Sequence, residues 1–139
     1  MFAEALVCLA LNVYHEARDQ PFIGQVAVAQ VVMNRVRDDR YPDNVCDVVK
    51  QGPTYSWKPN FPVRHRCQFS WYCDGKSDKT PDQTAWEQAL VIAQGVHTGN
   101  LDDFVEGATH YHATYVLPEW AESKTPVVQI GEHMFYRWD

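Results

Sequence analysis

Apolar positions in the first part of the chain predict two helices. Residues 3–18 hold no Gly or Pro, and their apolar side chains recur at the spacing of one helical face. Because the residue before a proline is pushed out of the helical region, we expect this helix to end before Pro21. A second helix is expected over residues 21–37, and its almost unbroken apolar surface indicates a central position in the core.

Two further helices are expected later in the chain. Asn44 follows a turn-like stretch and is a suitable N-cap for a short helix over residues 45–51. Pro81 is expected to open a longer helix that runs to Val96, since proline is tolerated in a first helical turn, and Gly99 lies just beyond its end. Helices therefore dominate the predicted fold.

The remaining stretches predict a loop and short strands. Prolines, Asn and basic residues make residues 52–66 a long loop or lid, and the aromatic residues of 67–73 predict a strand. Residues 107–116 and 127–138 both have irregular strand-like character. This order of elements indicates an α+β class, mainly helical, and one domain over residues 1–139.

Composition and charge narrow the possible partners. The chain is 45% hydrophobic, as is ordinary for a globular protein, and its formal net charge is −6. That charge argues against a nucleic acid, because binding a phosphate backbone requires many Lys and Arg side chains. The one basic stretch, Lys58 to Arg66, is either a solvated loop or a segment that steers an anionic polymer. We expect a monomer.

The apolar run from Ala5 to Leu11 raises the question of a membrane or export segment. It is far shorter than a bilayer span, and it lacks the basic flank and the small-residue cleavage site of a signal peptide. We therefore expect a core helix here, and no integral membrane segment.

The cysteines leave several pairings open. Cys8, Cys46, Cys67 and Cys73 allow three full pairings if all are oxidised. Cys8 lies among helical apolar residues, where simple packing explains it as well as a disulfide does. The spacing of Cys67 and Cys73 is unlike C-x-x-C and favours a structural disulfide over zinc or redox chemistry. An oxidising compartment is the resulting expectation.

Glu16 is the candidate acid. It lies in the last turn of the first predicted helix, beside His15 and four residues after Asn12. The negative end of the helix dipole and the apolar surroundings both favour a protonated carboxyl, which is the form that a general acid requires. On these residues alone, an ordinary ion pair with Arg18 or Arg35 is the simpler explanation.

Aromatic and amide side chains favour a carbohydrate as the substrate, because a sugar ring has apolar C–H faces and polar edges. The candidate sugar-binding residues are Gln68, Ser70, Trp71, His110 and Tyr111. Tryptophan is often largely buried in a core, so a packing role for Trp71 stays open.

Histidines offer a different chemistry. His110 and His112 alternate along a predicted strand and, with His133, would hold a metal in an amidase or peptidase. However, H-E-A-R-D has Asp19 where the helical zinc motif needs its second histidine, and no serine lies in a G-x-S-x-G elbow. We therefore expect neither a metal nor another cofactor.

Six sequence blocks, in order along essentially the whole chain, carry a family resemblance. They are A-L-N-V-Y-H-E-A-R, G-Q-V-A-V-A-Q-V-V-M-N-R-V, Y-P-D-N-V-C-D-V-V-K-Q, C-Q-F-S-W-Y-C-D-G, G-A-T-H-Y-H-A and I-G-E-H-M-F-Y. With these blocks the chain resembles the SleB-type cell wall hydrolase family, which includes spore-cortex-lytic enzymes and phage lysins.

The resemblance implies a lysozyme-like domain of the lytic transglycosylase kind. Its implied substrate is the β-1,4 bond between N-acetylmuramic acid and N-acetylglucosamine in peptidoglycan, and Glu16 falls on the position of the family's catalytic glutamate. Protonated Glu16 would donate its proton to the glycosidic oxygen. It would then act as base while the muramoyl C6 hydroxyl closes a 1,6-anhydro ring, or while water attacks. A transglycosylase needs no second carboxylate.

Two places depart from the family pattern. Asp19 stands where the family usually has glycine, and D-F-V-E-G at residues 103–107 replaces D-P-T-x-G, which removes a hydroxyl and adds Glu106. Asp19 would raise the pKa of Glu16 further if it points into the cleft, and would do little if it faces water.

The resemblance also implies where the protein acts. Peptidoglycan glycan strands are the expected partner, at the cell wall or in the periplasm. Because the sequence shows no signal peptide, a phage enzyme released by lysis machinery or carried by a virion is one expectation. A catalytically inert wall-binding module is the other alternative, although such a module needs no acid at a desolvated helix end.

Overall fold

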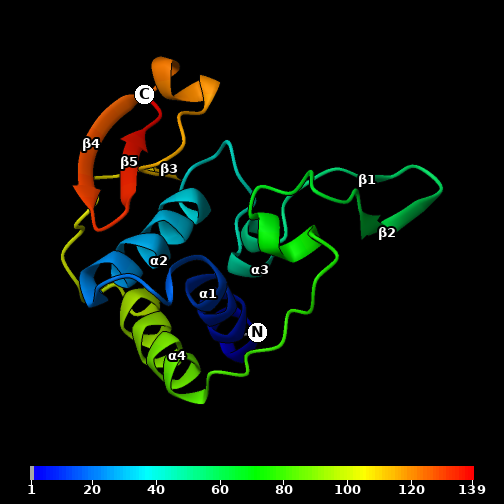
Figure 1. Ribbon diagram of the computed structural model, residues 1–139, viewed down its shortest axis with the longest axis horizontal. Helices are drawn as coiled ribbons and strands as arrows, with labels where there is room; N and C mark the ends of the chain where they lie inside the picture. The colour runs from blue at the N-terminus through cyan, green and yellow to red at the C-terminus, as the bar shows by residue number, and fades with distance from the viewer. Residues whose placement is uncertain (1) are drawn as a thin grey trace.

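A computed structural model describes residues 2–139 (Figure 1). The elements in chain order are α1 (Phe2–Ala17), α2 (Phe22–Val36), α3 (Val45–Val49), β1 (Thr54–Tyr55), β2 (Lys58–Pro62), η1 (Ser70–Cys73), α4 (Gln83–His97), β3 (His110–Ala113), η2 (Glu119–Ser123), β4 (Thr125–Ile130) and β5 (His133–Arg137). Helices dominate and the sheets are small, so the predicted α+β, mainly helical class is confirmed. Within residues 2–139, no helix has the length and hydropathy to cross a membrane.

Helix α2 lies at the centre of the helical part, as its apolar surface predicts. Residues 24–33 are all buried, and α1, α3, α4 and β4 contact this helix. On α1, Leu9 and Val13 are fully buried, and each stabilises the fold by about 2 kcal/mol relative to an exposed side chain. The core therefore fixes the position of α1, and with it the position of Glu16 in the last turn.

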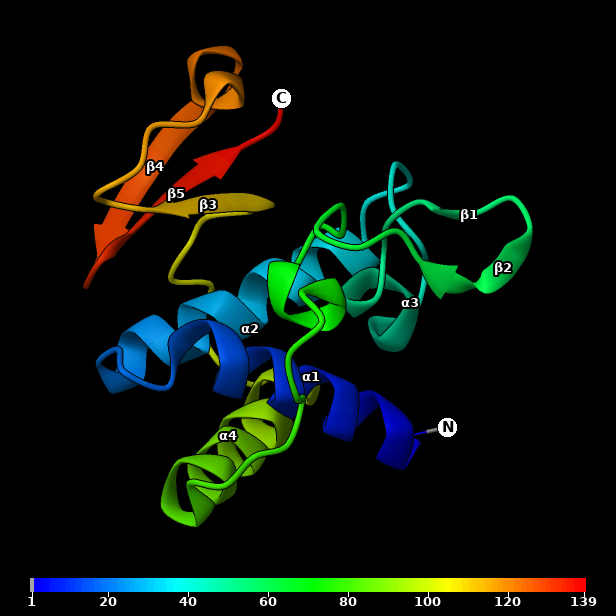
Figure 2. The same cartoon turned by 45° about the vertical axis from the view of Figure 1, so that its right-hand side comes forward.

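The larger sheet has the order β3-β5-β4, so the last strand of the chain is the middle one (Figure 2). Both pairings are antiparallel. Tyr111 pairs with Phe135 and Ala113 with His133, so these four side chains share one face of the sheet. Phe135 is fully buried in a cluster with Ala17 and residues of α2. The face that carries Tyr111 is therefore the face turned toward the helices.

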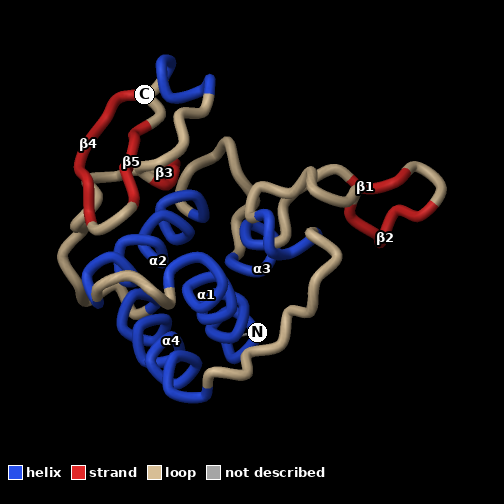
Figure 3. The backbone as a smooth tube through the Cα atoms, in the orientation of Figure 1, coloured by secondary structure: helices blue, strands red, loops and turns tan. Residues whose placement is uncertain are grey.

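Two predictions between α3 and α4 are wrong. Residues 52–66 were expected as a loop but contain the two-stranded hairpin β1–β2, shown in Figure 3 between long loop segments. Residues 67–73 were expected as a strand but contain the 3-10 helix η1. A strand of that length would span about 20 Å. The Cα atoms of Cys67 and Cys73 are 6.2 Å apart, because a disulfide joins the two ends.

Capping residues set the helix boundaries. Asn44 caps α3 as predicted, since its Oδ1 accepts from the backbone N–H of Asp47 at 2.9 Å. The longer helix α4 begins two residues later than predicted, because Asp82 is its N-cap and accepts from the N–H of Ala85 at 3.1 Å. The strand-like character of residues 107–116 and 127–138 is confirmed by β3 and β5, and β4 adds a strand that begins at Thr125.

Two disulfides resolve the pairing that the sequence left open. Cys67 pairs with Cys73, as the spacing favoured, and Cys8 pairs with Cys46. Cys8 therefore has more than a packing role, because its bond joins α1 to α3. In the chain-entropy view, closing this separation of 38 residues stabilises the fold by about 4 kcal/mol.

Candidate active site

Glu16 accepts a hydrogen bond from a tyrosine of the larger sheet. It is partly buried in the last turn of α1, and the hydroxyl of Tyr111 donates a hydrogen bond to its Oε1 at 2.5 Å. Burial raises the pKa of Glu16 above its ordinary value, and the bond from Tyr111 and the charge of Arg35 oppose that rise only in part. Burial, with the nearby Glu16 carboxylate, also holds the pKa of Tyr111 well above its ordinary value. Tyr111 therefore stays a donor.

The end of α2 places Tyr111 over Glu16. Asn34 Nδ2 donates to the carbonyl of Ala108 at 2.9 Å, and Arg35 Nε donates to the carbonyl of Thr109 at 2.7 Å. These carbonyls come just before β3, so the strand begins at a point that α2 fixes. The site is thus built by two core helices and one strand.

Glu16 opens onto a cavity of about 200 Å³ between the end of α1 and the sheet. Its walls are His15, Glu16, Ala17, Arg18, Asp19, Gln20, Ala113, Tyr115, Glu132 and His133. A second hollow of about 520 Å³ shares His15 and Arg18 with the first, and its other walls are Tyr14, Trp71 and residues of the 74–81 loop. A polymer that reaches Glu16 thus has room on either side of the end of α1.

The ion-pair explanation of Glu16 does not hold in the structure. The guanidinium of Arg18 lies over the ring of Tyr14, 4.7 Å from its centroid. That of Arg35 lies between the rings of Tyr41 and Phe69. Within residues 2–139, neither arginine forms an ion pair with Glu16. Arg35 acts on the carboxyl through its charge alone, and lowers its pKa.

One departure from the family pattern lies at the edge of the cavity, and the other lies outside its walls. Asp19 is exposed at the edge of the cavity, and the groups that shift the pKa of Glu16 are Tyr111 and Arg35, in addition to burial. Asp19 therefore behaves as a residue that faces water. The 103–107 stretch forms a turn in which Asp103 accepts from the N–H of Gly107 at 2.8 Å, and Glu106 is exposed there, outside the cavity walls.

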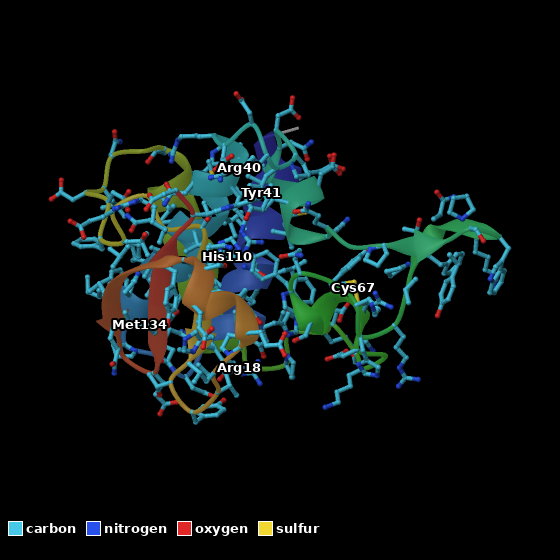
Figure 4. The ribbon with its side chains drawn as sticks, turned by 90° about the horizontal axis from the view of Figure 1, so that it is seen from above. Arg18, Arg40, Tyr41, Cys67, His110 and Met134 are labelled. Atoms are coloured by element: carbon cyan, nitrogen blue, oxygen red, sulfur yellow. A yellow bond between two sulfur atoms is a disulfide. The ribbon has the colours of Figure 1, made fainter. Side chains whose placement is uncertain are left out.

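Of the five predicted sugar-binding residues, Tyr111 bonds to Glu16, but none of the five is a wall of the cavity itself. Tyr111 reaches Glu16, whereas His110 lies on the opposite face of β3, 5.1 Å from Trp120 between ring centroids. In Figure 4, His110 lies toward Tyr41 and away from Arg18. Burial, with Arg35 and Lys124 nearby, lowers the pKa of His110 to about 4.

The other predicted residues lie on η1 or just before it. Trp71 is 8% exposed, its ring stacks on His15 at 4.6 Å, and its Nε1 donates to Asn12 Oδ1 at 2.9 Å. It therefore contributes to the core and to the wall of the second hollow. Gln68 and Ser70 are exposed beside it, outside both hollows.

The three histidines of the metal hypothesis do not converge. His133 pairs with Ala113, which places it on the face opposite His110 and His112. Both nitrogens of His112 have partners already, the carbonyl of Ala113 at 2.7 Å and the hydroxyl of Tyr136 at 2.8 Å. Within residues 2–139, no three His, Cys, Asp or Glu side chains form a metal-binding group. The metal-dependent amidase alternative is not favoured by this geometry.

Sequence reasoning assigned no role in sugar binding or acid chemistry to two cavity residues. Glu132 and His133 line the cavity, on the turn and strand that follow β4. His133 is 8% exposed and its ring contacts that of Tyr111, with centroids 5.0 Å apart. The sequence signal was present, because the alternation of a strand puts residues two apart on one face, here His133 and the core residue Phe135.

The family of the chain follows from its similarity to known proteins. The model of the family described as Cell Wall Hydrolase matches residues 19–136, so the chain belongs to the cell wall hydrolase family. That match begins three residues after Glu16.

Solved structures with a similar fold belong to a narrower class, that of the SleB catalytic domains. One is the catalytic domain of the germination-specific lytic transglycosylase SleB from Bacillus anthracis, with a TM-score of 0.68 and 28% identity over 96% of this chain and 93% of that one. Another is the catalytic domain of the Bacillus cereus SleB protein, with a TM-score of 0.66, 28% identity and coverage of 96% and 89%. The fold is thus that of the SleB catalytic domain, a lysozyme-like fold, as the resemblance implied.

Curated relatives are spore cortex-lytic enzymes. The protein of Halalkalibacterium halodurans is 34% identical over 91% of this chain and 33% of its own length. The protein of Bacillus subtilis is 28% identical over 91% of this chain and 35% of its own length. The chain therefore spans about a third of the length of these relatives.

Proposed function

We propose that this protein cleaves the β-1,4 bond between N-acetylmuramic acid and N-acetylglucosamine in peptidoglycan, as a lytic transglycosylase that acts at the cell wall. The observation that carries the proposal is Glu16, a carboxylic acid whose pKa is raised by burial and which opens onto a cavity. The similar SleB catalytic domain is described as a lytic transglycosylase, which supports the same reaction type here.

Glu16 acts first as acid and then as base. Its carboxyl proton passes to the glycosidic oxygen as the bond from C1 of the muramoyl residue breaks, and the N-acetylglucosamine end leaves as an alcohol. The Glu16 carboxylate then takes the proton of the muramoyl C6 hydroxyl. That oxygen forms a bond to C1 and closes the 1,6-anhydro ring, which returns Glu16 to its protonated state.

Tyr111 supports the second half of this cycle. Its hydroxyl remains a donor, so it stabilises the carboxylate that forms when Glu16 gives up its proton. Arg35 adds a positive charge at longer range. Burial therefore favours the protonated form of Glu16, and Tyr111 and Arg35 stabilise the carboxylate that forms when the proton is given up.

Sugar contacts on both sides of Glu16 are part of the proposal. Tyr111 lies at the acid, and Trp71 forms a wall of the second hollow. Gln68 and Ser70 are exposed next to Trp71, where they would contact the edges of a bound sugar. His110 lies on the other face of β3, so its predicted role in binding would require substrate beyond the cavity of Glu16.

The test is the variant Glu16→Gln, which keeps the size of the side chain and removes its acidic proton. We expect release of soluble fragments from purified sacculi to fall at least about 1,000-fold, within the range for loss of an acid/base group. The matched control Glu122→Gln, at an exposed glutamate of η2, should lyse at the wild-type rate. Retained lysis by Glu16→Gln would disprove the proposed role.

Fragment chemistry tests the reaction type separately. Mass spectrometry should find 1,6-anhydromuramoyl ends, which are lighter than reducing ends by one water. Reducing ends instead would mean that water attacks C1, as in a muramidase. Binding of the wild-type protein to sacculi without release of any fragment would favour the inert wall-binding module.

A further inference from the structure

The hairpin β1–β2 and the segment around it differ in charge from the rest of the molecule. Residues 48–73 contain no Asp or Glu, although the whole chain has 18 acidic residues and a net charge of −6. The same stretch carries Lys50, Lys58, Arg64 and Arg66. In Figures 1 and 3 the hairpin extends away from the helices. This part of the protein is suited to contact an anionic partner.

Exposed aromatic rings lie on this hairpin. Trp57 is 69% exposed and Phe61 is 57% exposed, so neither contributes much to a core. Lys58 lies between them, with Nζ 5.2 Å from the ring centroid of Trp57 and 4.9 Å from that of Phe61. The ring of Tyr55 is 5.3 Å from that of Trp57. Grouped exposed aromatic residues mark an interaction surface, since folding alone does not explain them.

A series of hollows joins this hairpin to Glu16. A hollow of about 340 Å³ has Phe61, Arg64, Tyr72 and Lys76 among its walls. Lys76 is also a wall of the hollow of about 520 Å³.

That larger hollow in turn shares His15 and Arg18 with the cavity of Glu16. The hollows are therefore neighbours, and a chain-like ligand that lies along them would lead from the acid to the hairpin. We name this path, from the cavity of Glu16 through the two hollows to Trp57 and Phe61, the glycan track.

We propose that the glycan track binds the peptidoglycan strand well beyond the bond that is cleaved, with Trp57 and Phe61 as the distal contacts. This inference rests on the proposed function, because it takes the same polymer as the ligand. The aromatic rings fit the C–H faces of the sugars, which supply apolar contact area at a rigid side chain. Lys58 and Lys76 pair with the free carboxylates of the stem peptides.

The ionic and the aromatic contacts should contribute differently to the affinity for the strand. Exposed ion pairs contribute little to affinity and are screened by salt, so Lys58 and Lys76 mainly speed association at low ionic strength. Trp57 and Phe61 should carry most of the distal affinity, as aromatic residues do at other interfaces. The glycan track therefore predicts a higher kcat/KM on long glycan strands than on short fragments.

The binding test uses the Glu16→Gln protein, so that the polymer is not degraded. Sedimentation with purified sacculi should show affinity about tenfold weaker when Trp57→Ala and Phe61→Ala are added. Val91→Ala is the matched control, since Val91 is 66% exposed on α4 and lies outside the glycan track. Both altered hairpin residues are exposed, and an unchanged Tm would confirm that the variants are folded.

The turnover test compares substrates of different length with Glu16 intact. The Trp57→Ala, Phe61→Ala protein should lose about tenfold in kcat/KM on long strands and keep the wild-type value on a tetrasaccharide, which the proposal confines to sites near Glu16. Equal loss on both substrates, or loss on neither, would overturn the inference.

Two further outcomes distinguish a failure of this inference from a failure of the proposed function. Unchanged sedimentation of the hairpin variant with sacculi, together with lost binding to phosphatidylglycerol vesicles, would assign the hairpin to a membrane surface and overturn the track. If Glu16→Gln still lyses sacculi, the proposed catalytic role fails. The turnover test with Glu16 intact would still decide whether the track binds the strand, because it compares long strands with a tetrasaccharide.

Discussion

The hydroxyl of Tyr111 and the carboxyl of Glu16 are 95 residues apart in sequence and 2.5 Å apart in the structure. Their hydrogen bond joins the last turn of α1 to the edge strand β3. It lowers the pKa of a carboxyl that burial raises, so the two residues together set the acidity at which the site works.

Tyr111→Phe should slow lysis of sacculi about 100-fold, because it removes one donor to the carboxylate that forms during bond cleavage. Without that donor the pKa of Glu16 rises further. Since the reaction needs protonated Glu16, activity is lost as pH rises through this pKa, and the basic limb of the pH–rate profile should move to higher pH. Tyr136→Phe, which removes a hydroxyl bond to His112 on the other face of the sheet, should change neither. An unmoved basic limb in Tyr111→Phe would contradict the assigned coupling.

Glu16→Gln should stabilise the protein at neutral pH. The folded-state pKa of Glu16 lies above its ordinary value of 4.5, so the fold favours the protonated form. As pH rises from 4.5 through that higher pKa, wild-type stability falls, whereas a neutral amide has no such loss. We expect Tm at pH 8 to be about 3 °C above wild type, and the difference to vanish near pH 4. Thermal unfolding at both pH values checks this, and a lower Tm for the variant at pH 8 would contradict it.

Asn34→Ala should lower the activity by more than its loss of stability alone would cause. Loss of its bond to the carbonyl of Ala108 costs about 1 kcal/mol of unfolding free energy and frees the chain that leads to Tyr111. We expect kcat to fall about tenfold with KM little changed, since Tyr111 would be misplaced over Glu16.

A double-mutant cycle is the check on this positioning role. Asn34→Ala in a Tyr111→Phe background should slow lysis much less than it does alone. Additive losses would show that Asn34 acts elsewhere. Asn100→Ala, at an exposed asparagine beyond α4, is the control and should leave both parameters at wild-type values.

The two disulfides should differ in their effect on stability. Replacing Cys8 and Cys46 by Ala should lower the free energy of unfolding by about 4 kcal/mol, and replacing Cys67 and Cys73 by about 2 kcal/mol, because the second pair closes a much shorter loop. Urea unfolding measures both. The Cys8–Cys46 disulfide lies away from the Glu16 cavity. Its replacement should therefore leave the activity per folded molecule at the wild-type level. A larger loss from the second pair would contradict the loop-length argument.

Local sequence patterns predicted the helices and the position of Glu16 at a helix end, and failed where distant residues decide the structure. The apolar spacing of residues 3–18 is enough to place Glu16 in a last helical turn. The bend of residues 67–73 depends on a covalent bond that aromatic content does not reveal. Strand alternation did contain one unused constraint: His110 and Tyr111 are neighbours on β3, so only one of them faces Glu16.

Contacts of long sequence separation were beyond such patterns. Nothing in the local sequence pairs Asn34 and Arg35 with the carbonyls before β3, although these bonds position Tyr111. The Cys8–Cys46 pairing likewise became clear only when α1 and α3 were side by side. The predicted roles of Gln68, Ser70 and Trp71 in sugar binding stay predictions, because they depend on where the polymer lies.

The position of β5 in the middle of the sheet makes the placement of Tyr111 depend on residues 133–137. Strand β3 pairs with β5, and β5 supplies Phe135, which supports Tyr111 from the core. During synthesis, the chain up to residue 132 would hold Glu16 on a formed helix with its tyrosine still unplaced. Loss of β5 by proteolysis would return the site to that state, so a cut far from Glu16 in the sequence would inactivate the site and leave Glu16 itself intact.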